Sequence, residues 1–448
     1  MSYISRRSIL RLSTMAGLAE VGYHFLQPSK LFASSSLAGD GYKALVCIAL
    51  DGGCDGNNVI IPLSQSSYAL YQRARATLAL QPPGLHACDD GSGRGYGFHT
   101  SLSRVAELYN SGQAAVLTNV GSLPNPLSKE DALNGTGTMP TDLMNHEMQR
   151  YQWGTSYAVT GATSNTYTGW GGRLADSLQA YNSGLFPAVT SLAPGADEGA
   201  FCFGQNTYPA VVAAGASLFP AQGQATLQMI SRTSSKATLI GQAAHGLKNA
   251  LDQSQILENA LQATSSDSTI VSPTSLGQQL TQVLQMIAAR GALGMKRQIF
   301  LCVLGGFDNH ANQLAYQNTA LADLDSCIGA FWDGLVKIGL QDQVTTFTTS
   351  DFGRTLTANT EGGSDHAWGN HHLIVGGAVR GNRFYGQFPD LTLNGPDDLA
   401  GQGRWIPTTS IDQYGATLAS WFGVSDSNLT GIFPNLKNFG TLKVGFLG

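Results

Sequence analysis

Residues 43–50 read KALVCIAL, and the turn DGGCD at residues 51–55 follows them directly. An apolar run of this kind, bounded by glycine, is typical of a central strand that is buried on both faces of a sheet. Residues 101–109 then place apolar side chains at helical spacing, and residues 114–120 form a second strand-like run. A strand, a helix and a strand in this order predict a doubly wound α/β fold, with a mostly parallel sheet between two layers of helices.

The same alternation continues toward the C-terminus. Residues 121–235 interrupt it, because they are rich in aromatic residues, proline and glycine, and we expect a loop-rich insertion or cap there. We therefore expect residues 39–448 to form a single three-layer α/β domain. The remaining expected elements are helices at 237–264, 275–291, 314–338 and 412–422, and strands at 299–304, 344–349 and 373–379.

The N-terminal segment has the features of an export signal. Residues 5–11 read SRRSILR, and a mildly apolar stretch follows at 12–26. That stretch is too short and too polar to be a stable membrane span, and SLA at 36–38 offers small residues for cleavage. We expect residues 1–38 to be a twin-arginine signal peptide, which makes the mature protein periplasmic or secreted. The alternative is a surface-active N-terminal helix.

Charge and cysteine content exclude several classes of protein. Only 12% of the 448 residues are charged, and no cluster of lysine and arginine indicates nucleic-acid binding. Residues 1–38 hold four of the 25 bases and one of the 30 acids, so a mature chain carries a formal charge of −8. The six cysteines include no CxxC pair of the kind found in zinc knuckles. Their number alone fixes no disulfide pairing.

Carboxylates and histidines follow the expected strands. Asp51 comes directly after the first strand, and Asp308 and His310 follow the strand at 299–304. The carboxyl ends of parallel strands meet at one edge of a sheet, so these side chains are predicted to converge. A carboxylate with an imidazole suits Zn, Mn or Fe. The alternatives are a turn aspartate at 51 and, for the second pair, a capping aspartate with a solvent-exposed histidine.

A third cluster is the richest in histidine. Asp351 follows the strand at 344–349, as a metal ligand or a loop cap, and the segment EGGSDHAWGNHH at 361–372 contains Asp365 and His366. The concentration of histidine near acidic strand ends indicates a metal site. We expect a divalent metal, Zn, Mn or another, held by Asp51, Asp308, His310, Asp351, Asp365 and His366.

Three further residues are candidates for catalytic roles. Arg354 can pair with a carboxylate or bind an anionic ester substrate through two hydrogen bonds. His146, in the segment NHEMQ, is either a site residue or an ordinary histidine on a helix face, and Asp55 lies in the turn after the first strand. His371 and His372 start a strand, and we expect them to contact the metal ligands without binding metal themselves or to lie in the protein core.

Several segments resemble a known family. ALDGGCDGNNVIIP, NHEMQ, GWGGRLAD, LGGFDNHANQ and TSDFGRTLTANTEGGSDHAWGNHHLIVGGAVRGNRFYG are similar, in family order, to the DUF1501 family of exported bacterial proteins. With the remaining segments the resemblance covers about residues 44–423. That family in turn resembles the alkaline phosphatase-like superfamily, which includes sulfatases and phosphodiesterases. The resemblance implies a doubly wound sheet with one or two divalent metals at the strand ends.

The resemblance assigns roles to some residues and departs at others. It implies metal-binding roles for Asp51, Asp308 and His366, and for His310 at a shorter than usual spacing from Asp308, in agreement with the strand-end pattern. Phe352 stands where the superfamily has a histidine ligand. The superfamily nucleophile, a Ser, Thr or Cys after the first aspartate, is matched only by Cys54.

Two functions remain open from the sequence. The first is an exported metal-dependent hydrolase of phosphate or sulfate esters, in which the metal activates water. The second is a catalytically inactive binding or assembly protein of the cell envelope, which the two departures favour. For this function the resemblance implies a DUF1800-type exported protein as the partner. A redox function is weaker, because the chain has no haem, iron–sulfur or dinucleotide motif.

Overall fold

The structure, a computed structural model, describes residues 41–158, 168–213, 239–264 and 271–448. The expected signal peptide at residues 1–38 lies outside these ranges. Within the described residues, no helix combines the length and the apolar character that crossing a membrane requires. All six cysteines are free thiols.

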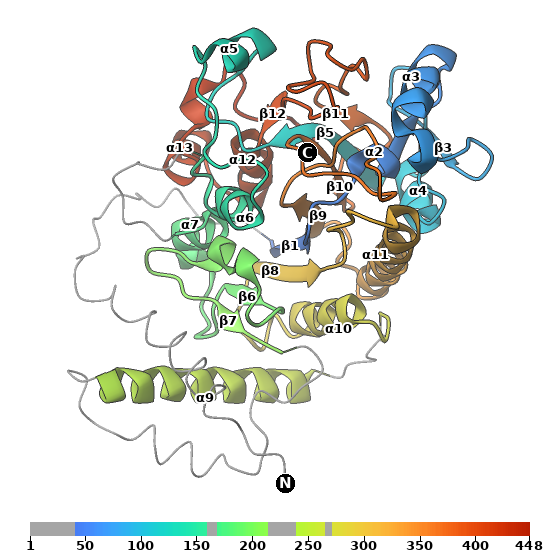
Figure 1. Cartoon of the computed structure of the whole chain (residues 1–448). Coiled ribbons are helices and arrows are strands. Elements are labelled where there is room, and N and C mark those ends of the chain that lie inside the picture. The colour runs from blue at the N-terminus through green and yellow to red at the C-terminus, as the bar shows by residue number, and fades with distance from the viewer. Residues whose placement is uncertain (1–40, 159–167, 214–238, 265–270) are drawn as a thin grey trace.

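A nine-stranded sheet forms the centre of the molecule (Figure 1). Its strands are β1 (Lys43–Leu50), β5 (Ala114–Gly121), β6 (Val189–Ser191), β7 (Ala210–Val211), β8 (Arg297–Leu304), β9 (Val344–Ser350), β10 (Asn370–Val375), β11 (Phe384–Tyr385) and β12 (Thr409–Ser410). Their order is β11-β5-β10-β9-β1-β8-β6-β7, and β12 pairs with β5. All pairs are parallel except those of β10, which runs antiparallel to β5 and β9. The predicted mostly parallel sheet is therefore confirmed.

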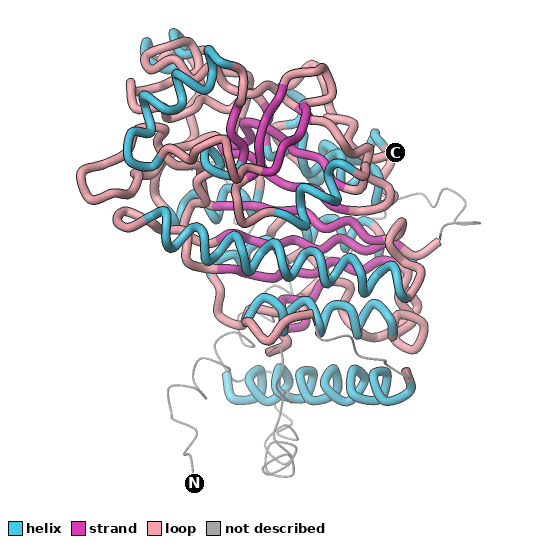
Figure 2. The backbone as a smooth tube through the Cα atoms, turned by 90° about the vertical axis from the view of Figure 1, so that its right-hand side faces the viewer, coloured by secondary structure: helices cyan, strands magenta, loops and turns pink. Residues whose placement is uncertain are grey.

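The two faces of the sheet are covered by different helices (Figure 1). Along β1, Val46 and Ile48 belong to one hydrophobic cluster and Leu45 and Cys47 to the other, because alternate side chains of a strand point to opposite faces. The first cluster contains α4 (Ser103–Asn110), α10 (Ser275–Ala288) and α11 (Gln313–Lys337), and the second contains α7 (Trp170–Ser177) and α12 (Ile411–Phe422). Figure 2 shows α10 and α11 running along the strands they cover. The arrangement is the predicted three-layer fold.

The described parts of the loop-rich segment at 121–235 add strands to the central sheet and short helices beside it. Its strands β6 and β7 extend the sheet beyond β8, and its helices are short. The short helices in these described parts are α5 (Lys129–Asn134), α6 (His146–Thr155) and α7.

Smaller elements complete the fold. A second, antiparallel sheet has the order β2-β4-β3. The elements not yet named are β2 (Ile60–Pro62), β3 (His86–Asp89), β4 (Gly95–Phe98), α2 (Gly56–Val59), α3 (Gln65–Arg75), α9 (Leu239–Ala263) and α13 (Leu429–Ile432). Helix α9 packs along α10, with Leu257 and Ala260 in the first hydrophobic cluster.

Candidate metal centre

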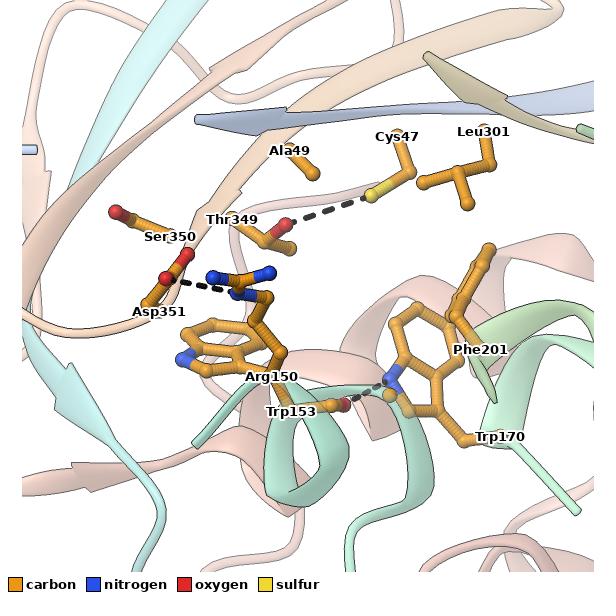
Figure 3. A pocket seen from close by; sticks show the side chains of 11 residues that line it. Cys47, Ala49, Arg150, Trp153, Trp170, Phe201, Leu301, Thr349, Ser350 and Asp351 are labelled. Atoms are coloured by element: carbon orange, nitrogen blue, oxygen red, sulfur yellow. Dashed lines mark hydrogen bonds and ion pairs between the residues drawn. The ribbon is translucent and has the colours of Figure 1, made fainter. Parts of the chain in front are cut away.

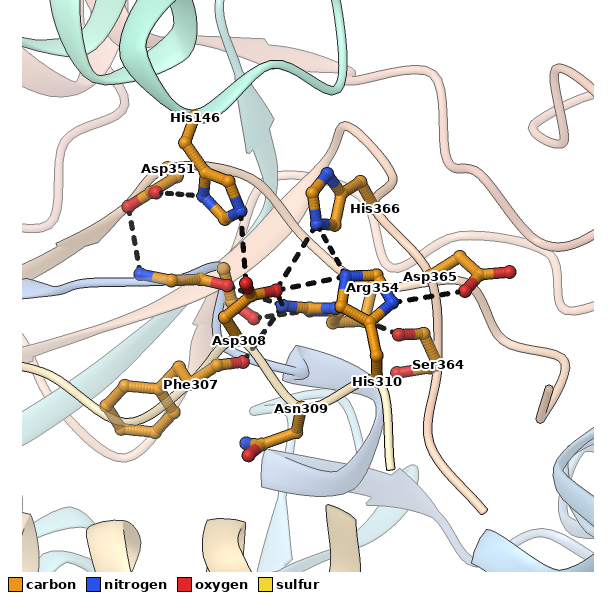
Figure 4. A network of polar contacts seen from close by, with 12 residues as sticks. His146, Phe307, Asp308, Asn309, His310, Asp351, Arg354, Ser364, Asp365 and His366 are labelled. Atoms are coloured by element: carbon orange, nitrogen blue, oxygen red, sulfur yellow. Dashed lines mark hydrogen bonds and ion pairs between the residues drawn. The ribbon is translucent and has the colours of Figure 1, made fainter. Parts of the chain in front are cut away.

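Four chain segments meet at the sheet edge where the parallel strands end (Figure 4). β1 runs into Asp51, β8 leads to Asp308, and β9 runs into Asp351. Because β10 runs the opposite way, its first residue lies at this same edge, and the loop before it brings Asp365 and His366 there. The structure thus brings together the strand ends that the sequence pattern predicts to converge.

Two glycines allow these segments to approach closely. Gly52 has φ +109°, and a Cβ at this position would lie 2.5 Å from the backbone nitrogen of Asp308. Gly53 has φ +81°, and its Cβ would collide with the ring of Phe352. A side chain is disfavoured at positive φ and is also sterically excluded here. The glycines therefore let the β1 turn lie directly against the loops after β8 and β9.

Helix α6 brings a histidine to the same edge. Asn145 caps the helix, since its side-chain oxygen accepts a hydrogen bond from the backbone N–H of Met148 at 3.0 Å. His146 is the first residue of α6 and points toward the strand ends (Figure 4). Its ring centroid lies 4.7 Å from that of Phe352. The site-residue alternative for His146 therefore matches its position, whereas a plain helix-face histidine does not.

Three imidazole rings are each held through Nδ1. Nδ1 of His146 lies 2.6 Å from Asp351 Oδ2, Nδ1 of His310 lies 3.3 Å from Asp365 Oδ1, and Nδ1 of His366 lies 2.8 Å from a backbone carbonyl. Carboxylate and carbonyl oxygens only accept hydrogen bonds, so in each neutral ring the proton is placed on Nδ1. The lone pair of each ring is then on Nε2.

The three Nε2 atoms face one carboxylate. His310 Nε2 lies 3.1 Å and His366 Nε2 3.3 Å from Asp308 Oδ1, and His146 Nε2 lies 3.6 Å from Oδ2. The Nε2 atoms of His310 and His366 are 2.9 Å apart. Lone pairs and a carboxylate at these distances repel each other unless a proton or a metal ion lies between them. His146 Nε2 is also a buried nitrogen without a hydrogen-bond partner among the described residues.

This donor set fits a transition metal. The ligand atoms of His146, Asp308 and His366 all lie within 4.8 Å of one another, and His310 adds a third imidazole beside them. Imidazole nitrogen and carboxylate oxygen are ligands for Zn²⁺ and similar ions. Metal-bound histidines usually donate their other N–H to a carboxylate or a carbonyl, which is the arrangement found for all three rings.

The charges of two ligands suit metal binding at neutral pH. Partial burial raises the pKa of Asp308, but the hydrogen bond and the charge of Arg354 outweigh it, so this pKa lies below its usual value. Burial lowers the pKa of His366, and the hydrogen bond to the Met144 carbonyl opposes this only in part. Asp308 is therefore ionised and His366 neutral, as metal ligands must be.

Arg354 is fully buried below this group. Its guanidinium donates to the carbonyls of Gly52 (2.6 Å), Gly53 (2.9 Å) and Ser364 (2.9 Å), and to Asp308 Oδ1 (2.5 Å). These contacts tie three of the converging loops together and fix the Asp308 carboxylate. Of the two alternatives that the sequence leaves open for Arg354, the structure thus shows the pairing with a carboxylate, that of Asp308, together with backbone carbonyls.

The other two strand-end carboxylates face a second arginine. Arg150 Nε lies 3.0 Å from Asp351 Oδ2, and an Arg150 terminal nitrogen lies 3.5 Å from Asp51 Oδ1. Sequence reasoning missed Arg150. It lies four residues after His146, so both side chains project from one face of α6, and the NHEMQR spacing is the signal that could have found it.

Asp55 and Cys54 are buried side chains whose contacts lie within the fold, away from the group around Asp308. The Asp55 carboxylate accepts from the backbone N–H of Asn57 at 3.1 Å as the cap of α2, and it forms a buried ion pair with Arg75 and a hydrogen bond with Gln313. The Cys54 thiol is buried, and burial raises its pKa. Neither side chain is among the groups that face Asp308.

A small cavity lies on the inner side of Arg150 (Figure 3). Its volume is about 30 Å³, which is room for about one water molecule. It is lined by Arg150 and Asp351 and, on its other sides, mainly by apolar groups, including Cys47, Ala49, Trp153, Trp170, Phe201 and Leu301. A substrate therefore has no room on this side. The side chains of Asp308, His310 and Asp365 are 50%, 48% and 44% exposed, so the approach is from their side.

Comparisons with solved structures give distant similarities. They include the PsFucS1 sulfatase from Pseudoalteromonas sp. (12% identity over 92% of this chain and 76% of that chain, TM-score 0.34). They also include the phosphonate monoester hydrolase of Agrobacterium radiobacter (12%, 86% and 74%, TM-score 0.34) and alkaline phosphatase from the Antarctic bacterium TAB5 (13%, 75% and 92%, TM-score 0.32).

Sequence comparison identifies the family. No curated protein matches the chain. Residues 42–402 match the family described as "Protein of unknown function (DUF1501)". The match covers most of the chain, including the strand ends at Asp51, Asp308 and Asp351 and the loop that carries His366. The chain therefore belongs to the DUF1501 family.

Proposed function

We propose that this chain is an exported, metal-dependent hydrolase of phosphate or sulfate esters. The observation that carries the proposal is the set of three imidazole rings whose Nε2 atoms face Asp308 while oxygen acceptors hold their Nδ1 atoms. The class of ester rests on the resemblance of the strand-end motifs to those of sulfatase-like and phosphatase-like enzymes. Export rests on the arginine pair in residues 5–11.

Hydrogen bonds from neighbouring side chains orient the proposed metal ligands. Asp351 and Asp365 orient His146 and His310, and Arg354 fixes Asp308. Ligands that are held in place by a second layer of hydrogen bonds bind metal more tightly than mobile ones. A bound divalent ion would polarise an ester oxygen and lower the pKa of a water molecule.

A second candidate function is a catalytically inactive binding or assembly protein of the cell envelope. The state of Cys54 favours it, because burial of the thiol disfavours the thiolate that a cysteine nucleophile needs. Phe352 also favours it, since its ring packs against His146 and His366 where the resemblance has a histidine ligand. In this function a DUF1800-type exported protein would be the partner.

Metal analysis separates the two functions. Protein purified without chelator is expected to contain about one equivalent of a transition metal, and Asp308→Ala is expected to lose it. His86→Ala is the matched control, because His86 lies outside the site and contacts the Thr100 carbonyl. Metal-loaded wild type, but not Asp308→Ala, should hydrolyse p-nitrophenyl phosphate or p-nitrophenyl sulfate.

The opposite result would favour the second function. If neither protein binds Zn, Mn or Mg when these are supplied, the hydrolase proposal is wrong. Co-purification with a DUF1800-type protein would then support a role in assembly. Export is tested separately by cell fractionation, where Arg6→Lys/Arg7→Lys should remain in the cytoplasm while the wild type leaves it.

A further inference from the structure

Among the described residues, the side chains that form ion pairs at the sheet edge carry a net negative charge. Four carboxylates and two guanidinium groups are linked there by ion pairs with one another or with the histidines: Asp51, Asp308, Asp351, Asp365, Arg150 and Arg354. With neutral histidines their formal charges sum to −2, which one divalent cation balances. A second divalent cation would leave an excess of two positive charges in a partly buried site, which is unfavourable in the absence of a bound anion.

Arg150 lies between two of these carboxylates. It is 3.0 Å from Asp351 Oδ2 and 3.5 Å from Asp51 Oδ1, so its guanidinium bridges the ends of the neighbouring strands β9 and β1. The Asp351 side chain is only 2% exposed. A buried carboxylate requires a positive partner, and here the protein itself supplies it.

The oxygens of Asp351 are also already used. Oδ2 accepts from His146 Nδ1 at 2.6 Å as well as from Arg150, and Oδ1 accepts from the backbone N–H of Gly52 at 3.3 Å. An ion bound between Asp51 and Asp351 would have to displace these donors. By contrast, the Nε2 atoms around Asp308 offer lone pairs, and His146 Nε2 has no hydrogen-bond partner among the described residues.

We propose that the site holds a single divalent ion, bound by His146, Asp308, His310 and His366, and that Arg150 occupies the place between Asp51 and Asp351 that a second ion would need. This inference rests on the metal site of the proposed function and specifies its nuclearity. Arg150 is then a positioning residue, which holds Asp351 in the geometry that orients His146 and supplies a fixed positive charge.

Metal stoichiometry in Arg150 variants tests the inference. Wild type should bind one equivalent of Zn²⁺ or Mn²⁺, and Arg150→Ala should gain a second, weaker equivalent, because Asp51 and Asp351 then lose the guanidinium group that bridges them. Arg150→Lys keeps the charge and should remain at one. Arg150→Ala/Asp51→Asn should also return to one, since it removes one of the two carboxylates without touching the four proposed ligands.

Anomalous diffraction from metal-soaked wild-type crystals decides the matter even if the variants do not fold. One peak among His146, Asp308, His310 and His366 is expected. A second peak between Asp51 and Asp351, or two equivalents in the wild type, would overturn the inference and leave the metal-dependent hydrolase standing. A stoichiometry of one in Arg150→Ala would also overturn it. Wild type without any metal would overturn both proposals.

Discussion

Gly52 lies in the turn after β1, where the backbone comes close to the loop that carries Asp308. Its φ of +109° and the closeness of the Asp308 backbone leave no room for a side chain. Gly52→Ala is therefore expected to lower the free energy of unfolding by roughly 1–3 kcal/mol from backbone strain, with the steric clash adding to it. Gly431→Ala is the control, because a Cβ atom added at Gly431 would meet no neighbouring atom. Chemical denaturation of both variants measures the difference, and equal stability would contradict the assigned contact.

Asp365 offers a test of ligand orientation. Its carboxylate accepts a hydrogen bond from His310 Nδ1 at 3.3 Å, and its side chain is 44% exposed. Replacing it should therefore leave the fold intact. Asp365→Asn is expected to weaken metal binding by roughly 10- to 100-fold, the usual effect of removing a partner of a ligating histidine. Competition with a chromogenic chelator measures the affinity. Glu361→Gln, in the same loop and exposed, should bind as the wild type does, and an equal loss in both variants would show a general charge effect instead.

The residues of the site differ in how far the sequence could predict them. Asp51 and Asp308 were placed correctly at one sheet edge, because strand direction alone sets their position. The contacts of Arg354 depend on loop conformation and those of Arg150 on where α6 packs against the sheet, and local sequence encodes neither. Hence the sequence left two partners open for Arg354, a carboxylate or an anionic substrate, of which the structure shows the Asp308 carboxylate, and it left Arg150 out.

The start of α6 links one helix to the metal site. The Asn145 cap satisfies a backbone N–H in the first turn, beside His146. Asn145→Ala is expected to cost about 1 kcal/mol of stability, as is usual for a lost cap, and to weaken metal binding because the first turn frays. Ser128→Ala removes the corresponding cap of α5, which carries no ligand. Metal affinity that falls only in Asn145→Ala would confirm the link, and affinity unchanged in both variants would contradict it.

Elements were predicted best where burial is symmetrical. β1 was expected at its observed bounds, because an apolar run buried on both faces has an unmistakable sequence pattern. β10 was expected at 373–379 but lies at Asn370–Val375. It begins with Asn370, His371 and His372, polar residues that are nevertheless buried; the two histidines were expected to start a strand, whereas hydrophobicity alone marks its start only at Leu373.

Over the whole molecule, buried histidines predict acid sensitivity. Burial lowers the pKa of His99 to about 4 and that of His371 and His372 to about 3. In the unfolded chain these histidines have a pKa near 6.5, so below that pH the unfolded chain binds more protons than the folded chain does. Stability should be full above about pH 6.5 and fall by up to about 1.4 kcal/mol per histidine for each pH unit below it.

His372→Phe isolates one part of this effect. The ring of His372 packs against Trp153 and Tyr414, with centroids 4.9 and 5.9 Å away, and phenylalanine can keep these contacts. Denaturation between pH 7.5 and 5.5 should show a smaller loss of stability for the variant than for the wild type. Parallel curves would mean that His372 becomes protonated in the folded protein as easily as in the unfolded one.

The four proposed ligands come from α6, from the loop after β8 and from the loop before β10, so no short piece of the chain contains the site. It exists only after strands far apart in sequence have paired. Nascent or partly folded chains therefore lack the complete ligand set, and a protein that crosses a membrane already folded has this set assembled, and open to an ion, before the crossing. Under the proposed export by the twin-arginine route, the metal content would then reflect the ions of the compartment in which the chain folds, whichever ions surround the protein where it works.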